Sequence, residues 1–198
     1  AMMDTAEKAV QSLQSLAMSI DQTGGISIAT LTARARRNKR RRNTKLIVVD
    51  YLQLMQASKR SNAGNRVQDV AEITTGLKAL AKELDVPVIA LSQLSRNVEH
   101  RDNKRPQLSD LRESGSIEQD ADIVLFVYRD EYYVERDRPQ EMSKYAEWQS
   151  RLQATVNKAE IIIGKQRHGE TGSVEVAFNP SLTQFSNLAR QEVPHDRA

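Results

Sequence analysis

Two polar residues follow short apolar stretches in the middle of the sequence, at positions where they could act on phosphate groups. Asp50 comes directly after the apolar residues 46–49, and Gln93 ends the stretch VPVIALSQ. A carboxylate at the tip of a rigid strand can hold a Mg²⁺-bound water beside nucleotide phosphates, as the Walker B aspartate of nucleotide hydrolases does. A side-chain amide on a neighbouring strand could sense a γ-phosphate or orient a water. Because many strands end on a polar residue, an ordinary strand end is the alternative for each.

The glycine-rich loop that would cradle the phosphates is missing from this sequence. A P-loop has the pattern G-x-x-x-x-G-K-[ST], and its backbone amides surround the phosphates. The stretch GGISIATL lacks the lysine, while Lys165 is followed by Gln166 and no glycine lies five residues before Gly164. The three histidines are scattered and cysteine is absent, so no zinc-ligand spacing is present either. The sequence therefore predicts phosphate-competent residues without a cradle of their own.

The elements that would position Asp50 and Gln93 have the pattern of a β-α-β unit. Residues 46–50 and 86–93 are short, apolar and rich in β-branched side chains, which is typical of strands covered on both faces. Between them, apolar residues recur at helical spacing over residues 66–84, which predicts a helix of about five turns. Such a unit makes the two strands parallel, with a right-handed crossover. Residues 122–129 are expected to form a third strand of the same kind.

The carboxyl ends of these strands would form one polar edge, where ligands bind in open parallel sheets. The residues at these ends are Asp50, Ser92, Gln93, Arg129 and Asp130. Elsewhere we expect helices at residues 4–16 and after Ser27, a short strand within residues 18–25, and two strands joined by a glycine-bearing turn at residues 160–178. The predicted fold class is therefore α/β: a parallel-stranded sheet flanked by helices, with a C-terminal β-hairpin.

The composition fits a globular protein that does not enter a membrane. The chain has 198 residues, of which 39% are hydrophobic and 28% are charged, and this length suits one sizeable domain. No apolar stretch approaches the roughly 20 residues that span a bilayer, and no signal-peptide pattern opens the sequence. Because the absence of cysteine suits a reducing compartment, we expect a cytoplasmic protein.

The positive net charge of +3 comes from one segment, which we call the basic run. Eight Lys and Arg residues lie between residues 34 and 45, and no acidic residue lies between Asp21 and Asp50. Without the basic run, acidic residues outnumber basic ones. The run could attract phosphate backbones, but a solvated helix face is the interpretation that we favour.

Two further polar or aromatic segments have alternative interpretations. Residues 110–122, DLRESGSIEQDAD, lie between two apolar stretches and could present backbone amides and Arg112 to phosphates; an exposed, capped turn is the alternative. The segment 131–157 contains Tyr132, Tyr133, Tyr145 and Trp148. These rings could stack on bases, but we favour a surface insertion whose helix is packed by Trp148 and Leu152.

Four stretches of the sequence together resemble the bacterial replicative DNA helicases of the DnaB type. They are LIVVDYLQLM, GLKALAKELDVPVIALSQLSRNVE, KRPQLSDLRESGSIEQDADIVLFVYRDE and AEIIIGKQRHG. Their order and spacing match this family over roughly residues 4–188, and the combination is far more specific than any single motif. The resemblance assigns residues 1–188 to the C-terminal portion of a RecA-like motor domain and residues 189–198 to a polar tail.

The resemblance implies an ATPase that works as a homohexameric ring with ATP and Mg²⁺ at its subunit interfaces. Such a ring unwinds duplex DNA while it moves along one strand, and primase and a helicase loader are its implied partners. Asp50 is similar to the Walker B aspartate, which holds Mg²⁺ through water, and Gln93 is similar to the γ-phosphate sensor. Lys165 and Arg167 are similar to the pair that reaches across to the ATP of the neighbouring subunit.

The same resemblance assigns DNA contacts and shows what this chain lacks. Arg112, Glu113 and Gly115 match the loop that lines the channel and grips the DNA backbone, whereas the basic run receives no such role. The collar domain, the P-loop and the catalytic glutamate of the family lie upstream of Ala1, so we expect an incomplete motor domain. The segment 131–157 is also longer than in many relatives. We expect the parent protein to be an ATP-dependent DNA helicase and the isolated fragment to be inactive; alternatively, the fragment is a non-catalytic DNA- or protein-binding module.

Overall fold

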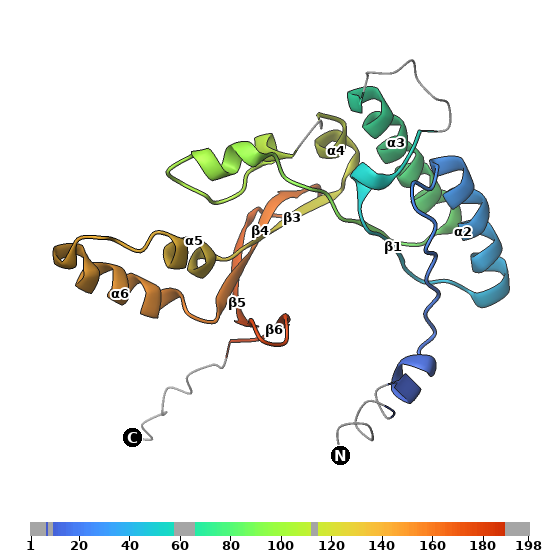
Figure 1. Cartoon of the computed structure of the whole chain (residues 1–198). Helices are drawn as coiled ribbons and strands as arrows, with labels where there is room; N and C mark the ends of the chain where they lie inside the picture. Colours follow the sequence, from blue (N-terminus) through green and yellow to red (C-terminus); the bar gives the residue numbers. More distant parts are fainter. Residues whose placement is uncertain (1–6, 8–9, 58–65, 112–114, 189–198) are drawn as a thin grey trace, which may run out of the picture.

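The computed structural model describes residues 7, 10–57, 66–111 and 115–188, which form two β-sheets with helices packed beside them (Figure 1). In chain order the α-helices and strands are α2 (Ile28–Arg42), β1 (Ile47–Val49), α3 (Arg66–Leu84), β2 (Val88–Ala90), α4 (Gly115–Asp120), β3 (Ile123–Tyr128), α5 (Asp130–Arg136), α6 (Tyr145–Thr155), β4 (Lys158–Gln166), β5 (Gly172–Asn179) and β6 (Gln184–Ser186). The short 3₁₀ helices are η1 (Leu52–Leu54), η2 (Arg96–His100), η3 (Leu108–Asp110) and η4 (Met142–Lys144). None of the helices in these ranges is long and apolar enough to cross a membrane.

The predicted β-α-β unit is confirmed in the part of the molecule that contains β1, α3 and β2. The two strands are parallel, with Ile47 opposite Val88, and α3 covers the residues expected from the sequence. The α3 side chains at helical spacing are buried because they pack into the core. They are Val70, Ile73, Leu77 and Leu80.

Helix α2 packs against α3 (Figure 1). It begins where Ser27 accepts a hydrogen bond from the backbone N–H of Thr30 at 3.2 Å, which confirms the predicted cap. It ends at Arg42 and is capped by Asn43, whose φ of 51° is left-handed. The contact with α3 is close because Gly76 has no Cβ; an added Cβ would lie 2.5 Å from Cγ1 of Ile28.

The third strand expected at residues 122–129 is formed as β3, but in the described residues this strand does not pair with β1 or β2. Strand β3 belongs to a separate antiparallel sheet with the order β3-β4-β5-β6. Its side chains alternate between buried and exposed, as in an antiparallel sheet with one covered face. The β3 hexapeptide is apolar or aromatic at every position, which is the pattern of a strand covered on both faces, so the sequence did not indicate a strand with one exposed face. The predicted C-terminal hairpin is confirmed as β4 and β5.

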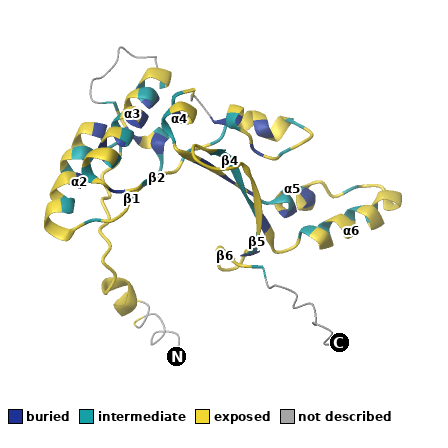
Figure 2. Cartoon of the chain, turned by 180° about the vertical axis from the view of Figure 1, so that it is seen from behind, coloured by how far each residue is buried: buried dark blue, intermediate teal, exposed yellow. Residues whose placement is uncertain are grey.

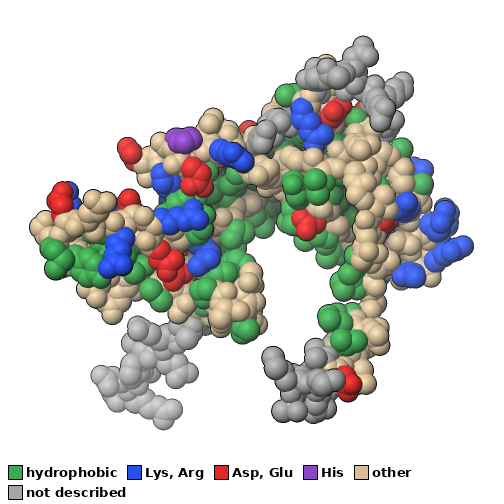
Figure 3. Space-filling view, viewed as in Figure 1, with side chains coloured by type: hydrophobic (Ala, Val, Ile, Leu, Met, Phe, Trp, Pro, Cys, Tyr) green, Lys and Arg blue, Asp and Glu red, His purple; other side chains and the backbone are tan. Residues whose placement is uncertain are grey.

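Both sheets present apolar side chains to solvent. In β3, Ile123, Leu125 and Val127 are each more than half exposed. Val48 and Ile89 lie opposite each other in the first sheet and are also more than half exposed. Figure 2 shows exposed stretches along both sheets. Figure 3 shows hydrophobic side chains beside the hollow between the part with β1 and β2 and the part with β3–β6. The described residues therefore leave apolar sheet surface that a closed domain would cover.

The segment 131–157 forms the pair of helices α5 and α6, which pack against each other. Trp148 donates a hydrogen bond from Nε1 to the carbonyl oxygen of Val134 at 2.7 Å, and Val134 is buried. The guanidinium of Arg136 lies 3.8 Å from the ring centre of Tyr132. Trp148 and Tyr132 thus make contacts within the segment, which agrees with a packed surface insertion.

The N-terminal expectations are only partly covered by the described residues. Residues 10–14 are helical, and the remainder of the helix expected at residues 4–16 lies mostly outside the described ranges. The short strand expected within residues 18–25 is not formed, since residues 17–23 have no regular secondary structure. This part of the chain instead lies beside α2, where Arg34 forms an ion pair with Asp21.

Candidate functional site

Asp50 and Gln93 lie at the same edge of the first sheet, as predicted. The ladder of β1 and β2 ends with Val49 opposite Ala90, and Asp50 follows immediately. The backbone contact continues beyond the strands, because the N–H of Leu91 donates to Val49 and the N–H of Leu52 donates to Leu91, both at 2.9 Å. The chain therefore brings the segments that carry Asp50 and Gln93 together at the carboxyl ends of β1 and β2.

The Asp50 carboxylate and the Gln93 side-chain amide are both available to a ligand. Both residues are exposed. Within the described parts of the chain, neither side chain forms a hydrogen bond or an ion pair, although the backbone of Gln93 does. Polar groups at the tip of a sheet with no internal partner can bind phosphate oxygens or metal-bound water.

The residues at this edge fit a Mg²⁺ ion shared with a nucleotide, and they do not form an all-protein metal site. No group of three or more acidic or histidine side chains that could hold an ion occurs among the described residues. Mg²⁺ commonly keeps several waters and is bound through one or two carboxylates together with substrate phosphates. A single carboxylate such as Asp50 suits that arrangement, because it can hold the ion through a bound water while the phosphates and waters supply the ligands.

Gln53 joins the segment that carries Asp50 to the segment that carries Gln93. The sequence pattern placed Ser92 at this edge but did not indicate Gln53. Gln53 lies in η1, three residues after Asp50. Its Nε2 donates to Ser92 Oγ at 3.0 Å, and its Oε1 accepts from the backbone N–H of Gln93 at 3.1 Å. The sequence signal was a single amide within the apolar stretch YLQLM, which does not show where that amide points.

Lys165 and Arg167 lie at the end of β4 in the second sheet, away from the edge that carries Asp50. The Lys165 ammonium donates to the backbone carbonyl oxygens of Glu118 and, at 3.4 Å, of Gln119, near the C-terminal end of α4. These carbonyls attract a cation because they sit at the negative end of the helix dipole. In the described residues, no hydrogen bond or ion pair links this pair of cations to Asp50 or Gln93.

Arg167 is held by Asp122 through both its backbone and its side chain. Its N–H donates to the Asp122 carbonyl at 2.8 Å, and its guanidinium lies 3.5 Å from Asp122 Oδ1. Lys78 also pairs with Asp122, and the Lys78 hydrogen bond is the largest cause that lowers the pKa of this carboxyl; Arg167 adds to it. The Arg167 side chain remains 61% exposed, so a surface pair of this kind holds it weakly.

The predicted DNA-contacting residues are only partly described. Arg112 and Glu113 lie outside the described residues, and Gly115 is the exposed first residue of α4. The chain before this segment is held firmly, because Arg101 donates two hydrogen bonds to the buried carboxylate of Asp110, at 2.9 and 2.8 Å. The far end of α4 is also fixed, since Thr74 donates to Asp120 at 2.6 Å.

Arg129 and Asp130, which the sequence placed at the same polar edge, are engaged elsewhere. They follow β3, which belongs to the second sheet. The Arg129 guanidinium lies 4.1 Å from the ring centre of Phe178 and pairs with the buried Glu131 at 2.9 Å. Asp130 accepts a hydrogen bond from the Tyr128 hydroxyl at 2.8 Å, and burial together with this contact raises the pKa of Tyr128. These side chains stabilise the second sheet and its helices.

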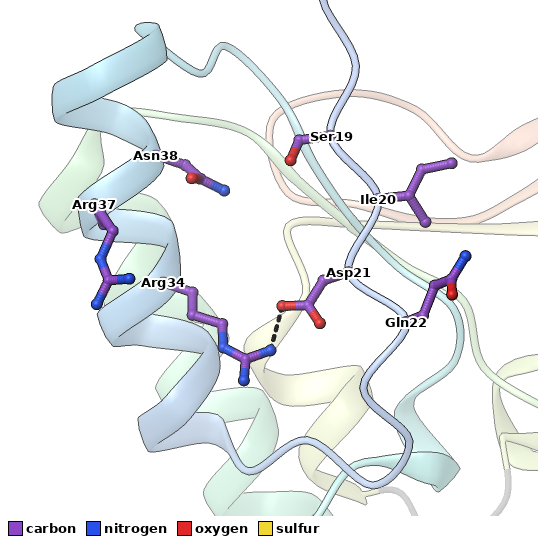
Figure 4. Close-up of a pocket in the computed structure, with 7 residues that line it drawn as sticks. All are labelled: Ser19, Ile20, Asp21, Gln22, Arg34, Arg37 and Asn38. Carbon is purple, nitrogen blue, oxygen red and sulfur yellow. Dashed lines mark hydrogen bonds and ion pairs between the residues drawn. The ribbon is translucent and has the colours of Figure 1, made fainter.

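The basic run lies mostly on α2, where Lys and Arg side chains gather at one edge of the molecule (Figure 3). Part of it is used in surface ion pairs: Arg36 donates two hydrogen bonds to Glu83, both at 2.6 Å. Arg34 and Asp21 line a polar pocket between α2 and residues 19–22 (Figure 4). The Arg34 hydrogen bond is the largest cause that lowers the pKa of Asp21 to about 2. These contacts agree with a solvated helix face.

Comparison with known proteins places the chain in one family. The DnaB-like helicase C terminal domain matches residues 1–187. Replicative DNA helicase DnaB of Rickettsia bellii is 50% identical over 190 residues, which cover 93% of this chain and 38% of that protein. Replicative DNA helicase DnaB of Geobacillus stearothermophilus is 50% identical over 183 residues, covering 92% of this chain and 37% of that protein. The chain thus spans less than two fifths of the length of these relatives.

Solved structures agree with this assignment and with the predicted fold class. A DnaB-like replicative helicase, described with its interactions with primase, has a TM-score of 0.75 and 38% identity over 92% of this chain and 40% of its own. A second solved structure, an ATPase domain, has a TM-score of 0.67 and 42% identity over 83% of this chain and 52% of its own. The RecA-like fold class is therefore confirmed, and the chain belongs to the family of DnaB-like helicase C-terminal domains.

Proposed function

We propose that these residues are part of an ATP-dependent replicative DNA helicase that unwinds duplex DNA as a homohexameric ring. The observation that carries the proposal is that Asp50 and Gln93 lie at the same sheet edge. Both side chains are exposed there and have no internal partner in the described residues. The family assignment and the 50% identity to replicative DNA helicases support it. The proposed setting is the cytoplasm, where the chromosome of a bacterial cell is replicated.

The roles proposed for Asp50 and Gln93 follow from phosphoryl transfer, in which the protein mainly positions groups and neutralises charge. The Asp50 carboxylate would accept hydrogen bonds from the waters of a bound Mg²⁺. When bound, Mg²⁺ would neutralise charge on the β- and γ-phosphates. The Gln93 amide would donate to a γ-phosphate oxygen, and this contact is absent when ADP occupies the site.

Lys165 and Arg167 are proposed to contact ATP bound by a neighbouring subunit. Their position on the second sheet supports this role, because within the described residues they contact α4 and Asp122 and not the edge that carries Asp50. Arg167 is held by an exposed ion pair at 3.5 Å, and such a pair contributes little stability. The arginine could therefore exchange Asp122 for a phosphate at small cost.

The exposed apolar sheet surface supports the proposal that the motor domain extends beyond these residues. Large contiguous apolar patches are uncommon on the surface of complete monomeric domains, and they mark surfaces that another segment or partner covers. We propose that residues 1–188 complete their motor domain with preceding residues of the intact protein, which would bring the P-loop and cover this surface. Residues 189–198 would form a tail.

The remaining proposed partners are single-stranded DNA, primase and a helicase loader. Arg112, Glu113 and Gly115 would contact the DNA backbone, since phosphate contacts are the main source of sequence-independent affinity. A primase contact is proposed by analogy with the similar replicative helicase described with primase. As a second candidate function, the isolated chain would act as a non-catalytic binding module, which the exposed apolar surface favours.

The substitution Asp50→Asn in the intact protein tests the proposed function. It keeps the shape of the side chain but removes its charge, so ATP turnover should fall at least about 100-fold, the usual effect of losing one preorganised electrostatic contact. Asp102→Asn is the matched control, because Asp102 is exposed and forms no ion pair in the described residues. Wild-type turnover by Asp50→Asn would refute the assignment.

The isolated chain should show no Mg²⁺-dependent ATP hydrolysis, and measurable turnover would contradict the absence of a complete site.

A further inference from the structure

The Gln53 side chain adds hydrogen bonds to the backbone ladder that joins the segments of Asp50 and Gln93. The paired strands end at Val49 and Ala90, and two backbone hydrogen bonds extend the contact to Leu91 and Leu52. Beyond these, the Gln53 amide bonds the Ser92 hydroxyl and the Gln93 N–H at 3.0 and 3.1 Å. A primary amide carries the donor and the acceptor of a peptide group, so Gln53 can take the place of one.

We propose that Gln53 is a positioning residue, which fixes Gln93 relative to Asp50 so that the Gln93 side chain can distinguish ATP from ADP. This inference rests on the proposed function, in which Gln93 contacts the γ-phosphate. In this role Gln53 acts through the backbone of Gln93 and the hydroxyl of Ser92, not by contact with the nucleotide. We call this set of contacts the clamp.

The clamp is rigid because Gln53 is anchored on both sides. Its neighbours Leu52 and Met55 are 2% and 3% exposed and pack in the core. Its own carbonyl oxygen accepts a hydrogen bond from Arg66 at 2.5 Å, at the start of α3. The core and α3 thus fix the position of the Gln53 amide. Because this amide is hydrogen-bonded to the Gln93 N–H, it fixes the backbone of Gln93 as well.

Loss of the clamp should change sensing more than folding. Gln93 is exposed, so its freed N–H can bond water and no buried polar group is left unpaired. The backbone of residues 92–93 would nevertheless gain freedom, and misplacing a positioned group by about 1 Å can cost roughly 100-fold in rate. We therefore expect a kinetic effect without a comparable loss of stability.

The test compares Gln53→Met, Gln93→Ala and the double variant in the intact protein. Methionine keeps the length of glutamine but removes every hydrogen bond of the clamp. Gln53→Met should lower kcat about tenfold or more and reduce the preference for a non-hydrolysable ATP analogue over ADP, with the Kd for ADP unchanged. Because Gln53 acts through Gln93, the double variant should match Gln93→Ala, as expected for residues that form one unit.

Two controls separate positioning from a structural role. Gln56→Met makes the same change in the same segment, at a side chain that forms no hydrogen bond in the described residues, and should leave kcat and nucleotide preference unchanged. Ser92→Ala removes the clamp contact to Ser92 and keeps those to the Gln93 backbone, so it should give a smaller effect of the same kind. This variant keeps the test decisive if Gln53→Met does not fold.

The outcomes distinguish this inference from the proposed function. If Gln93→Ala lowers kcat and nucleotide preference while Gln53→Met and Ser92→Ala do not, the clamp is refuted and the sensor stands. If the effects of Gln53→Met and Gln93→Ala multiply, Gln53 does not act through Gln93 and the inference fails. If Gln93→Ala itself changes neither quantity, the sensor assignment in the proposed function fails together with the inference.

Discussion

Replacing Asp110 with alanine tests how firmly the chain is held where it leads into the proposed DNA-contacting segment. Asp110 is 4% exposed, and its carboxylate accepts hydrogen bonds from Arg101 at 2.9 and 2.8 Å and from the N–H of Gln107 at 2.9 Å. Its carbonyl oxygen also accepts from the N–H of Ser95 at 2.7 Å. The buried Asp110 carboxylate therefore ties the end of this loop, just before Leu111, to Arg101 and Gln107.

The expected cost of Asp110→Ala is about 3 kcal/mol. Truncating one partner of a buried ion pair usually costs about 3–5 kcal/mol, because the other charge stays buried without its partner. Arg101 keeps a side-chain exposure of 31%, so water can solvate it in the variant, and the lower end of that range applies. Local opening of residues 95–111 should then become about 100-fold more frequent, since each 1.36 kcal/mol is a factor of about ten.

Hydrogen exchange of the intact protein measures this local opening directly. Amides in residues 95–111 should exchange about 100-fold faster in Asp110→Ala, while amides in the buried half of α3 keep their rates. Asp102→Ala is the matched control, because Asp102 lies in the same loop, is exposed, and has no ion pair in the described residues. Equal exchange rates in the two variants would refute the reasoning.

Three further predictions concern separate parts of the chain. Arg112→Ala should weaken single-stranded DNA binding and lower the slope of log K against log salt by about 0.7, the value for one phosphate contact; an unchanged slope in a salt titration would count against the DNA contact. The Asp21 carboxyl should titrate near its lowered pKa of about 2, so its contribution to stability is present above the ordinary pKa of 3.8 and is lost as the pH falls toward 2. In an NMR titration, Arg34→Gln should return the midpoint toward 3.8, and a midpoint near 3.8 before substitution would contradict this. Trp148→Phe removes the 2.7 Å bond to the Val134 carbonyl and should destabilise the α5–α6 contact by about 1 kcal/mol, seen as faster exchange of α5 amides; unaltered exchange would show that the bond is not needed.

The periodic parts of the fold could be predicted from the sequence. Helix α3 has the predicted bounds, because its apolar residues follow one helical face and are buried there. The cap at Ser27 followed from the hydroxyl before an apolar-periodic stretch. The order of strand, helix and strand was enough to predict that β1 and β2 are parallel.

The pairing of β3 and the fine contacts of the site could not be predicted in the same way. Residues 123–128 are apolar or aromatic at every position, and the sequence does not state which neighbour they will pair with. The role of Gln53 depends on the direction of one side chain in a 3₁₀ turn. Likewise, the contact of Lys165 with the carbonyls of α4 joins residues 47 positions apart, and no local pattern encodes such a contact.

Mixing two inactive variants tests most directly whether ATP sites are shared between subunits. In the intact protein, Asp50→Asn and Arg167→Ala should each strongly reduce ATP turnover when every subunit carries the substitution. In mixed rings, some interfaces combine an unsubstituted Asp50 on one subunit with an unsubstituted Arg167 on the next, so turnover should rise above that of either variant alone. If Asp50 and Arg167 instead act within one subunit, every site in the mixture carries a defect. Turnover that never exceeds that of the separate variants, at any mixing ratio, would contradict the account.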